Sequence, residues 1–165
     1  AIQRRIENGI PLTGNGWPGI NVRWCTGLLK THLINKAVNQ IKGNYHALHY
    51  IGIAYDEQKR CKGEIYPLVE WQVTEAQALK YCYEHGYDWD GLYEIYHRCS
   101  CWCCPFQRIS ELRNLRTHHS ELWKKLLDMD KRAIKMFGTT PLGSFRKGCT
   151  VQALEERFTS EAAAA

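Results

Sequence analysis

The sequence predicts an α/β protein, a mostly parallel sheet flanked by helices and followed by a helical C-terminal region. Residues 47–54 form a short, almost continuous apolar run with β-branched and aromatic members, which is typical of a strand buried on both faces. Residues 65–71 form a second extended segment, in which Pro67 favours an edge or a strand end. Helical patterns follow these two segments, and that order favours an α/β core.

Helices are expected before, between and after the two strands. Residues 2–8 predict a short helix, and the glycine- and proline-rich residues 11–19 predict a loop. Apolar residues recur on one face over residues 28–41, which indicates an amphipathic helix. Thr74 is expected to cap a helix that stops at Gly86, and Ser110 is expected to cap another. The last two helices are expected over residues 120–137 and 150–158.

The bulk composition is that of a soluble protein with one core. The chain has 165 residues and a net charge of +5, which suits an anionic ligand such as a nucleotide, contact with nucleic acid, or an ordinary solvated surface. The sequence lacks an apolar run long enough to span a membrane, so we expect no membrane partner. Residues 1–7 lack the apolar segment of a secretory signal, and the eight cysteines bunch together. A cytoplasmic location is therefore expected.

Three regions are expected along the chain. Residues 1–107 would form the α/β core with its cysteine cluster, and residues 108–161 the helical C-terminal region. The four alanines at 162–165 would be an appended tail.

Four cysteines stand within six residues, which indicates a metal site before a disulfide knot. Cys101 and Cys104 form a Cys-x-x-Cys pair, whose spacing lets two thiolates reach one metal ion. Cys25 follows a glycine-rich loop and precedes a helix, whose N-terminus stabilises a thiolate. The predicted ligand set is Cys25, Cys101 and Cys104, together with either Cys103 or Cys99.

Four thiolates suit a 4Fe–4S cluster or a structural zinc ion, and the residue types leave both open. The remaining cysteines, Cys61, Cys82 and Cys149, are interpreted as ordinary small residues.

Three cations are candidates for binding an anion. Arg23 and Lys30 stand seven residues apart, about two helical turns, at the start of a helix that follows a glycine-rich loop. Arg60 ends a charged run that directly follows the first expected strand, where parallel sheets bind ligands. Its guanidinium could hold a phosphate through two hydrogen bonds. The alternative for all three is a solvated surface position.

Taken in order, four segments of this chain resemble the phosphoadenosine phosphosulfate (PAPS) reductase family of the adenine-nucleotide α-hydrolase-like (PP-loop) superfamily. They are Arg23-Trp24-Cys25-Thr26 with Lys30, residues 52–60 (Gly-Ile-Ala-Tyr-Asp-Glu-Gln-Lys-Arg), residues 66–71 (Tyr-Pro-Leu-Val-Glu-Trp) with Thr74, and Cys101-x-x-Cys104 after Leu92-Tyr93. The resemblance covers about residues 20–107.

The resemblance implies a function in sulfur metabolism. An adenylyl-sulfate type nucleotide would bind at the carboxyl end of the sheet, with Arg23, Lys30 and Arg60 facing the phosphosulfate. Sulfite would be released reductively with a thiol reductant such as thioredoxin. In the cluster-bearing branch of the family, cysteines equivalent to Cys25, Cys101 and Cys104 hold iron–sulfur. Cys149, in the setting Gly-Cys-Thr where the family has Glu-Cys-Gly, is the candidate nucleophile.

The chain departs from the family at its beginning, because the Ser-Gly-Gly-x-Asp-Ser loop that holds nucleotide phosphates does not occur. We therefore expect a fold that is incomplete at the N-terminus, with the PP-loop supplied by a separate chain or a missing segment. Two alternatives remain open. One is a related PP-loop enzyme that inserts sulfur into nucleic acid, and the other is a catalytically degenerate metal-binding module.

Overall fold

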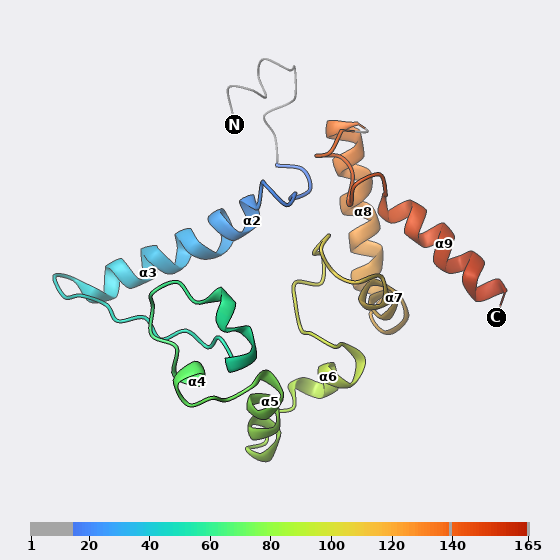
Figure 1. Ribbon diagram of the computed structural model, residues 1–165. Helices are drawn as coiled ribbons and strands as arrows, with labels where there is room; N and C mark the ends of the chain where they lie inside the picture. Colours follow the sequence, from blue (N-terminus) through green and yellow to red (C-terminus); the bar gives the residue numbers. More distant parts are fainter. Residues whose placement is uncertain (1–14, 139, 165) are drawn as a thin grey trace. The chain divides into compact units, whose positions relative to one another are not determined.

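The computed structural model describes residues 15–138 and 140–164, and this part of the chain is helical (Figure 1). Helices account for 58% of it, and it contains no strand. The expected parallel sheet is therefore wrong. The helical elements are α2 (Trp24–Thr26), the π-helical turn η1 (Gly27–Thr31), α3 (His32–Lys42), the 3₁₀ turn η2 (Tyr55–Arg60), α4 (Pro67–Glu70), α5 (Glu75–Glu84), the 3₁₀ turn η3 (Trp89–Gly91), α6 (Leu92–Ile95), α7 (Ile109–His118), α8 (Ser120–Phe137) and α9 (Val151–Ala163).

The chain divides into two compact units. The first unit comprises residues 1–32 and 96–165, and the second comprises residues 33–95. We describe each by itself. The helix expected over residues 2–8 and the first part of the loop expected over residues 11–19 lie outside the described residues.

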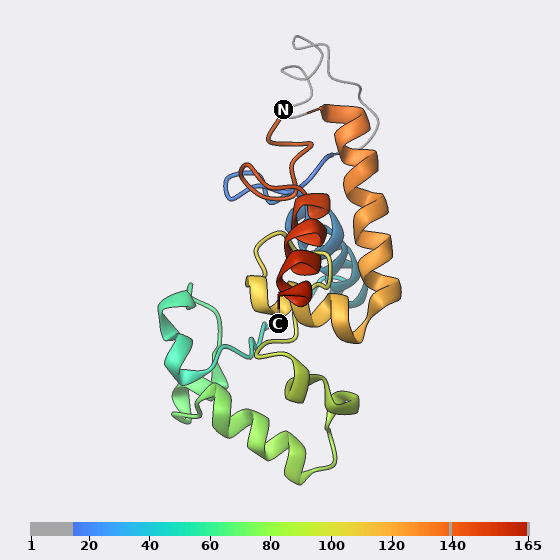
Figure 2. The ribbon, with the colours of Figure 1, turned by 90° about the vertical axis from the view of Figure 1, so that its right-hand side faces the viewer.

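Helices α7, α8 and α9 form the frame of the first unit, and α8 is the longest of them (Figure 2). The expected helix over residues 120–137 is confirmed as α8, which ends where Gly138 takes a positive φ of 59°. The helix expected after Ser110 is present as α7, but it begins at Ile109 with Arg108 in the N-cap position. Thr150 caps α9 by accepting a hydrogen bond from Ala153 N–H at 3.1 Å.

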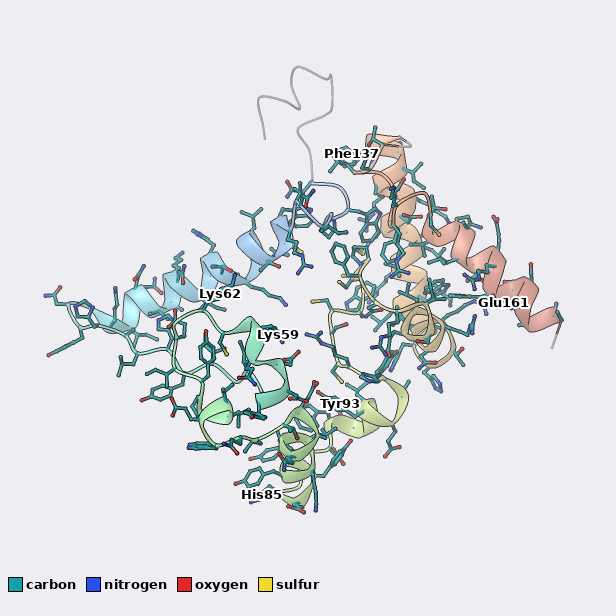
Figure 3. The ribbon with its side chains drawn as sticks, in the orientation of Figure 1. Lys59, Lys62, His85, Tyr93, Phe137 and Glu161 are labelled. Carbon is teal, nitrogen blue, oxygen red and sulfur yellow. The ribbon has the colours of Figure 1, made fainter. Side chains whose placement is uncertain are left out.

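The core of the first unit lies between these helices. Its buried apolar side chains come from all three helices and from two flanking segments, and they are Trp17, Leu112, Leu115, Trp123, Leu126, Ala133, Phe145, Val151, Leu154 and Phe158. Figure 3 shows the side chains of α7, α8 and α9 as sticks, with Phe137 labelled at the end of α8 and Glu161 on α9. The apolar burial of this frame is the main source of its stability.

A buried carboxylate joins three segments of this core. Asp130 on α8 is 1% exposed. Its Oδ1 accepts a hydrogen bond from Trp17 Nε1 at 3.0 Å, and its Oδ2 accepts one from Val151 N–H at 2.7 Å. Burial raises the pKa of Asp130, while hydrogen bonds from Val151, Trp17 and Gln152 oppose that shift. Asp130 thereby fixes the start of α9 and the segment around Trp17 to α8.

A second carboxylate joins α7, α8 and α9. Glu155 on α9 accepts two hydrogen bonds from the Arg116 guanidinium, both at 2.8 Å, and another from Trp123 Nε1. Chiefly because of the hydrogen bond from Arg116, the pKa of Glu155 is lowered to about 2. Glu155 is therefore ionised over the whole physiological pH range.

In the second unit, both expected strands are replaced by other structure. Residues 47–54 contain a single isolated parallel bridge, between Tyr50 and Ile65, and only Ile53 and Ala54 of this run are buried. Pro67 begins helix α4. Proline lacks the N–H that the first helical position leaves unpaired, and its fixed φ suits that position. Most of the segment 65–71, which was expected to be extended, is therefore a helical turn.

Two further helices were expected and are confirmed, one that runs from the first unit into the second and one within the second unit. The helix over residues 28–41 is present as α2, η1 and α3, which run consecutively from Trp24 to Lys42. Helix α5 begins after Thr74, whose hydroxyl accepts a hydrogen bond from Gln77 N–H while Gln77 Oε1 accepts one from Thr74 N–H. This reciprocal pair is a capping box. None of the helices in the described ranges is both long and apolar enough to cross a bilayer.

Candidate metal centre

The cysteine loop, residues 99–107 of the first unit, curls into a turn at its Cys-x-x-Cys pair. Cys104 N–H donates to the Cys101 carbonyl at 3.0 Å, and Gln107 N–H donates to the Cys104 carbonyl at 3.2 Å. The Gln107 side-chain amide donates to the same Cys101 carbonyl at 2.8 Å. These bonds bend the backbone around the two thiols, as a pair of ligands to one metal requires.

The cysteine loop is fixed to the core of the unit by Arg146. Its Nε donates to the Pro105 carbonyl at 2.7 Å, and its Nη2 donates to the Gln107 carbonyl. Trp102 and Cys103 also pack against the buried core. The position of the loop is therefore set by the core of the unit and by the segment that carries Arg146.

Cys25 lies beside this loop, although it is more than seventy residues away in sequence. The Arg23 guanidinium stands 5.1 Å from the centroid of the Phe106 ring, which places the start of α2 against the loop. Burial raises the pKa of the Cys103 thiol, and negative charge on Cys101, Cys104 and Cys25 raises it further. The Cys25 thiol is therefore within electrostatic range of the cysteine loop.

The donor set fits a thiophilic metal, because thiolates are the ligands that zinc and iron–sulfur clusters take. In the two described ranges, no three cysteine, histidine, aspartate or glutamate side chains are arranged as a ready coordination sphere. Cys25, Cys101 and Cys104 each act electrostatically on the Cys103 thiol; Cys101 is exposed, and the other three cysteines are half-buried. Neighbouring thiolates repel one another, and a bound cation would offset that repulsion.

The other cysteines have different surroundings. Cys99 is exposed and near the Tyr96 hydroxyl, whose pKa is raised first by burial and then by negative charge on Glu111 and Cys99. Cys149 packs against the core, and its Sγ lies 3.5 Å from the Thr150 carbonyl oxygen. All eight cysteines of the chain are free, and Cys61 and Cys82 belong to the second unit.

The three candidate cations are divided between the units. Arg23 and the exposed Lys30 are in the first unit with the cysteine loop. Arg60 is in the second unit, where its guanidinium pairs with Glu57 within η2. The structure thus places two of the three in the unit that carries the thiols.

The four segments that carry the family resemblance likewise fall into two pairs. The segments around Cys25 and around Cys101–Cys104 lie together in the first unit. The other two lie together in the second unit, because Tyr55 N–H donates to the Val73 carbonyl at 2.8 Å and Asp56 Oδ1 accepts from Glu75 N–H at 3.1 Å.

Sequence reasoning missed the residues that position the site. Gln107 and Arg146 hold the cysteine loop, and no motif marks either of them. His119, which no motif marks either, is half-buried and stacks on Tyr96 with ring centroids 5.8 Å apart. Within the described part of the chain, Glu111 Oε2, Tyr96 Oη and His119 Nε2 are buried without a hydrogen-bond partner. Tyr96 starts the segment that leads into the cysteine loop, whereas Glu111 lies on α7 and His119 directly follows that helix.

Comparison of the whole chain with family models, with curated proteins and with solved structures finds no match in any of the three.

Proposed function

We propose that Cys25, Cys101, Cys103 and Cys104 hold a 4Fe–4S cluster, with a structural zinc ion as the alternative, in a PAPS reductase-like protein. The observation that carries this proposal is the approach of Cys25 to the cysteine loop from a distant part of the sequence. When bound, the group would neutralise thiolate charge and hold the loop to the start of α2. Eight free thiols suit a reducing compartment such as the cytoplasm.

The proposed reaction is the reductive release of sulfite from an adenylylated sulfate. A thiolate attacks the sulfate sulfur, the bond to the phosphate oxygen breaks, and the nucleotide leaves with both electrons of that bond. A thiol reductant such as thioredoxin then attacks the cysteine sulfur of the thiosulfonate, which releases sulfite and leaves a disulfide. Arg23 and Lys30 would offset the charge of the leaving nucleotide. Cys149, the candidate nucleophile that the family resemblance implies, would be the attacking thiolate.

Metal content tests the centre. Protein purified without oxygen should contain about four irons per chain if the site holds a cluster, or about one zinc ion in the alternative. Cys25→Ser should lower that content severalfold, because it removes one of four ligands. Cys82→Ser is the matched control, since Cys82 is a half-buried cysteine of the second unit. Equal metal content in the two variants would exclude Cys25 as a ligand.

Sulfite release tests the reaction. The protein is incubated with sulfur-labelled adenylyl sulfate and a dithiol, with and without a protein that supplies a PP-loop. Labelled sulfite that disappears in Cys149→Ser would support the proposed chemistry. A metal-loaded protein that binds no adenylyl sulfate under either condition would instead indicate the degenerate metal-binding module.

A further inference from the structure

Basic charge is concentrated in the first unit. Its described residues contain fourteen lysines and arginines against seven aspartates and glutamates, whereas the second unit contains six against nine. Two of the seven acids, Glu111 and Asp130, are buried, and a third, Glu155, is bonded to Arg116. The surface of the first unit is therefore more cationic than the net charge of the whole chain indicates.

Part of this charge surrounds a hollow between the cysteine loop and α8. The hollow has a volume of about 620 Å³, and it is lined by Trp102, Lys125, Asp128, Met129, Lys131 and Arg132. Lys125, Met129 and Arg132 follow one another at intervals of four and three residues, so they share one face of α8. We call these three residues and Trp102 the Trp102–α8 face.

The cations of this face are available to a ligand. In the residues that the structure describes, the ion pairs include neither Lys125 nor Arg132. Arg132 Nε donates to the Asp128 carbonyl of its own helix, at 3.3 Å. The one carboxylate that lines the hollow, Asp128, stands 3.9 Å from the ammonium of Lys131. That lysine offsets its charge.

From this juxtaposition we propose that the Trp102–α8 face binds single-stranded nucleic acid. A base stacks on the Trp102 indole beside the Met129 side chain, and Lys125 and Arg132 contact the flanking phosphates. An aromatic platform bordered by unpaired cations is the combination by which proteins hold single strands. A duplex keeps its bases stacked on one another, so it cannot use the indole. The proposal depends neither on the metal nor on sulfite release.

The test measures binding of a fluorescent single-stranded oligonucleotide of about 16 nucleotides at several salt concentrations. Lys125→Gln/Arg132→Gln should weaken binding at least tenfold at about 50 mM salt, and it should reduce the salt slope by about one to two. Lys59→Gln/Lys62→Gln is the matched control, because it removes two exposed cations of the second unit (Figure 3). The control should change the affinity less than twofold.

The indole is tested separately. Trp102→Leu should weaken binding at least fivefold without changing the salt slope, and Trp102→Phe should restore most of the affinity because it keeps an aromatic ring. Circular dichroism and metal content of each variant show whether the cysteine loop is intact. The lysine–arginine variant changes only exposed side chains, so the proposal can be judged even if Trp102→Leu misfolds.

Three results with oligonucleotides would overturn the proposal. They are absence of binding at about 50 mM salt, equal affinity of the chain and the Lys125→Gln/Arg132→Gln variant, and equal affinity for a duplex of the same length. Equal affinity for polyglutamate would also overturn it, because the face would then recognise negative charge without a base.

Discussion

Replacement of Glu155 by glutamine should make the first unit less dependent on pH. The pKa of Glu155 is lowered from 4.5 to about 2, mainly by the hydrogen bond from Arg116. A shift of one pKa unit corresponds to about 1.4 kcal/mol, so the folded state gains about 3 kcal/mol from the ionised carboxylate. The Glu155 side chain is 27% exposed, and solvent screening reduces the expected gain to about 2 kcal/mol.

The sign of the effect follows from the lowered pKa. The stabilisation is complete above pH 4.5, the pKa of an unperturbed glutamate, and it is lost as the pH falls toward about 2. Glu155→Gln should therefore be about 2 kcal/mol less stable than the natural chain at neutral pH, and nearly as stable near pH 2.

Urea unfolding followed by circular dichroism at a series of pH values measures this difference. Glu156→Gln is the matched control, because Glu156 is exposed and its Oε1 accepts only from Gln152, at 3.3 Å. That variant should follow the natural chain at every pH. A difference between the Glu155→Gln variant and the natural chain that stays constant from pH 7 to about pH 2 would refute the reasoning.

Three further substitutions test other parts of the fold. The amide of Asp130→Asn has one oxygen for two buried donors, so the free energy of unfolding in urea should fall by about 1–3 kcal/mol. An unchanged free energy of unfolding would contradict the buried network. In Thr74→Ala, α5 loses its capping box, and the free energy of unfolding in urea should fall by about 1 kcal/mol. Thr74→Ser keeps the hydroxyl and should restore most of that free energy. In Gly16→Ala, a Cβ would stand 2.5 Å from the Leu142 carbonyl oxygen at a φ of +64°, so the melting temperature should fall by several degrees, whereas Gly27→Ala, with open space around it, should leave it unchanged.

The helices could be predicted because their signals are local. Apolar residues at helical intervals mark α3 and α8, and Thr74 and Thr150 each supply a side-chain oxygen to the first turn that follows. Each of these signals lies within a few residues of the structure it specifies. One error of this kind concerns α7, where Ser110 resembled a cap but lies inside the helix.

The strands were predicted wrongly because a strand is not a local structure. An apolar run of eight residues becomes a strand only if neighbouring segments accept its backbone hydrogen bonds. Residues 47–54 find one such contact, where Ile51 N–H donates to the Ile65 carbonyl at 2.9 Å and Ile65 N–H donates to the His49 carbonyl at 3.3 Å. Beyond this pair, helical turns η2 and α4 satisfy the backbone over shorter distances in sequence.

The surroundings of the thiols could be predicted only in part. The spacing of Cys101 and Cys104 indicated a shared turn, and the hydrogen bond between their backbones forms one. The contacts that position this turn join residues with no local relation, since Arg146 reaches the Pro105 carbonyl across 41 residues and the Gln107 carbonyl across 39. Whether the four thiols share a metal stays a prediction.

The division of charge explains why the net charge of the sequence was a weak guide to binding. The net charge of +5 is the sum of the charges of a basic unit and an acidic one. Charges act over a Debye length of about 8 Å at physiological salt, so a ligand within contact distance of α8 responds to the cations beside it. The two charge populations meet at two boundaries, between His32 and Leu33 and between Ile95 and Tyr96. The first boundary lies inside one continuous helical pattern that no change of composition marks. The cations of α8 are local in sequence, but the Trp102 side chain that completes the face joins them only when the chain folds.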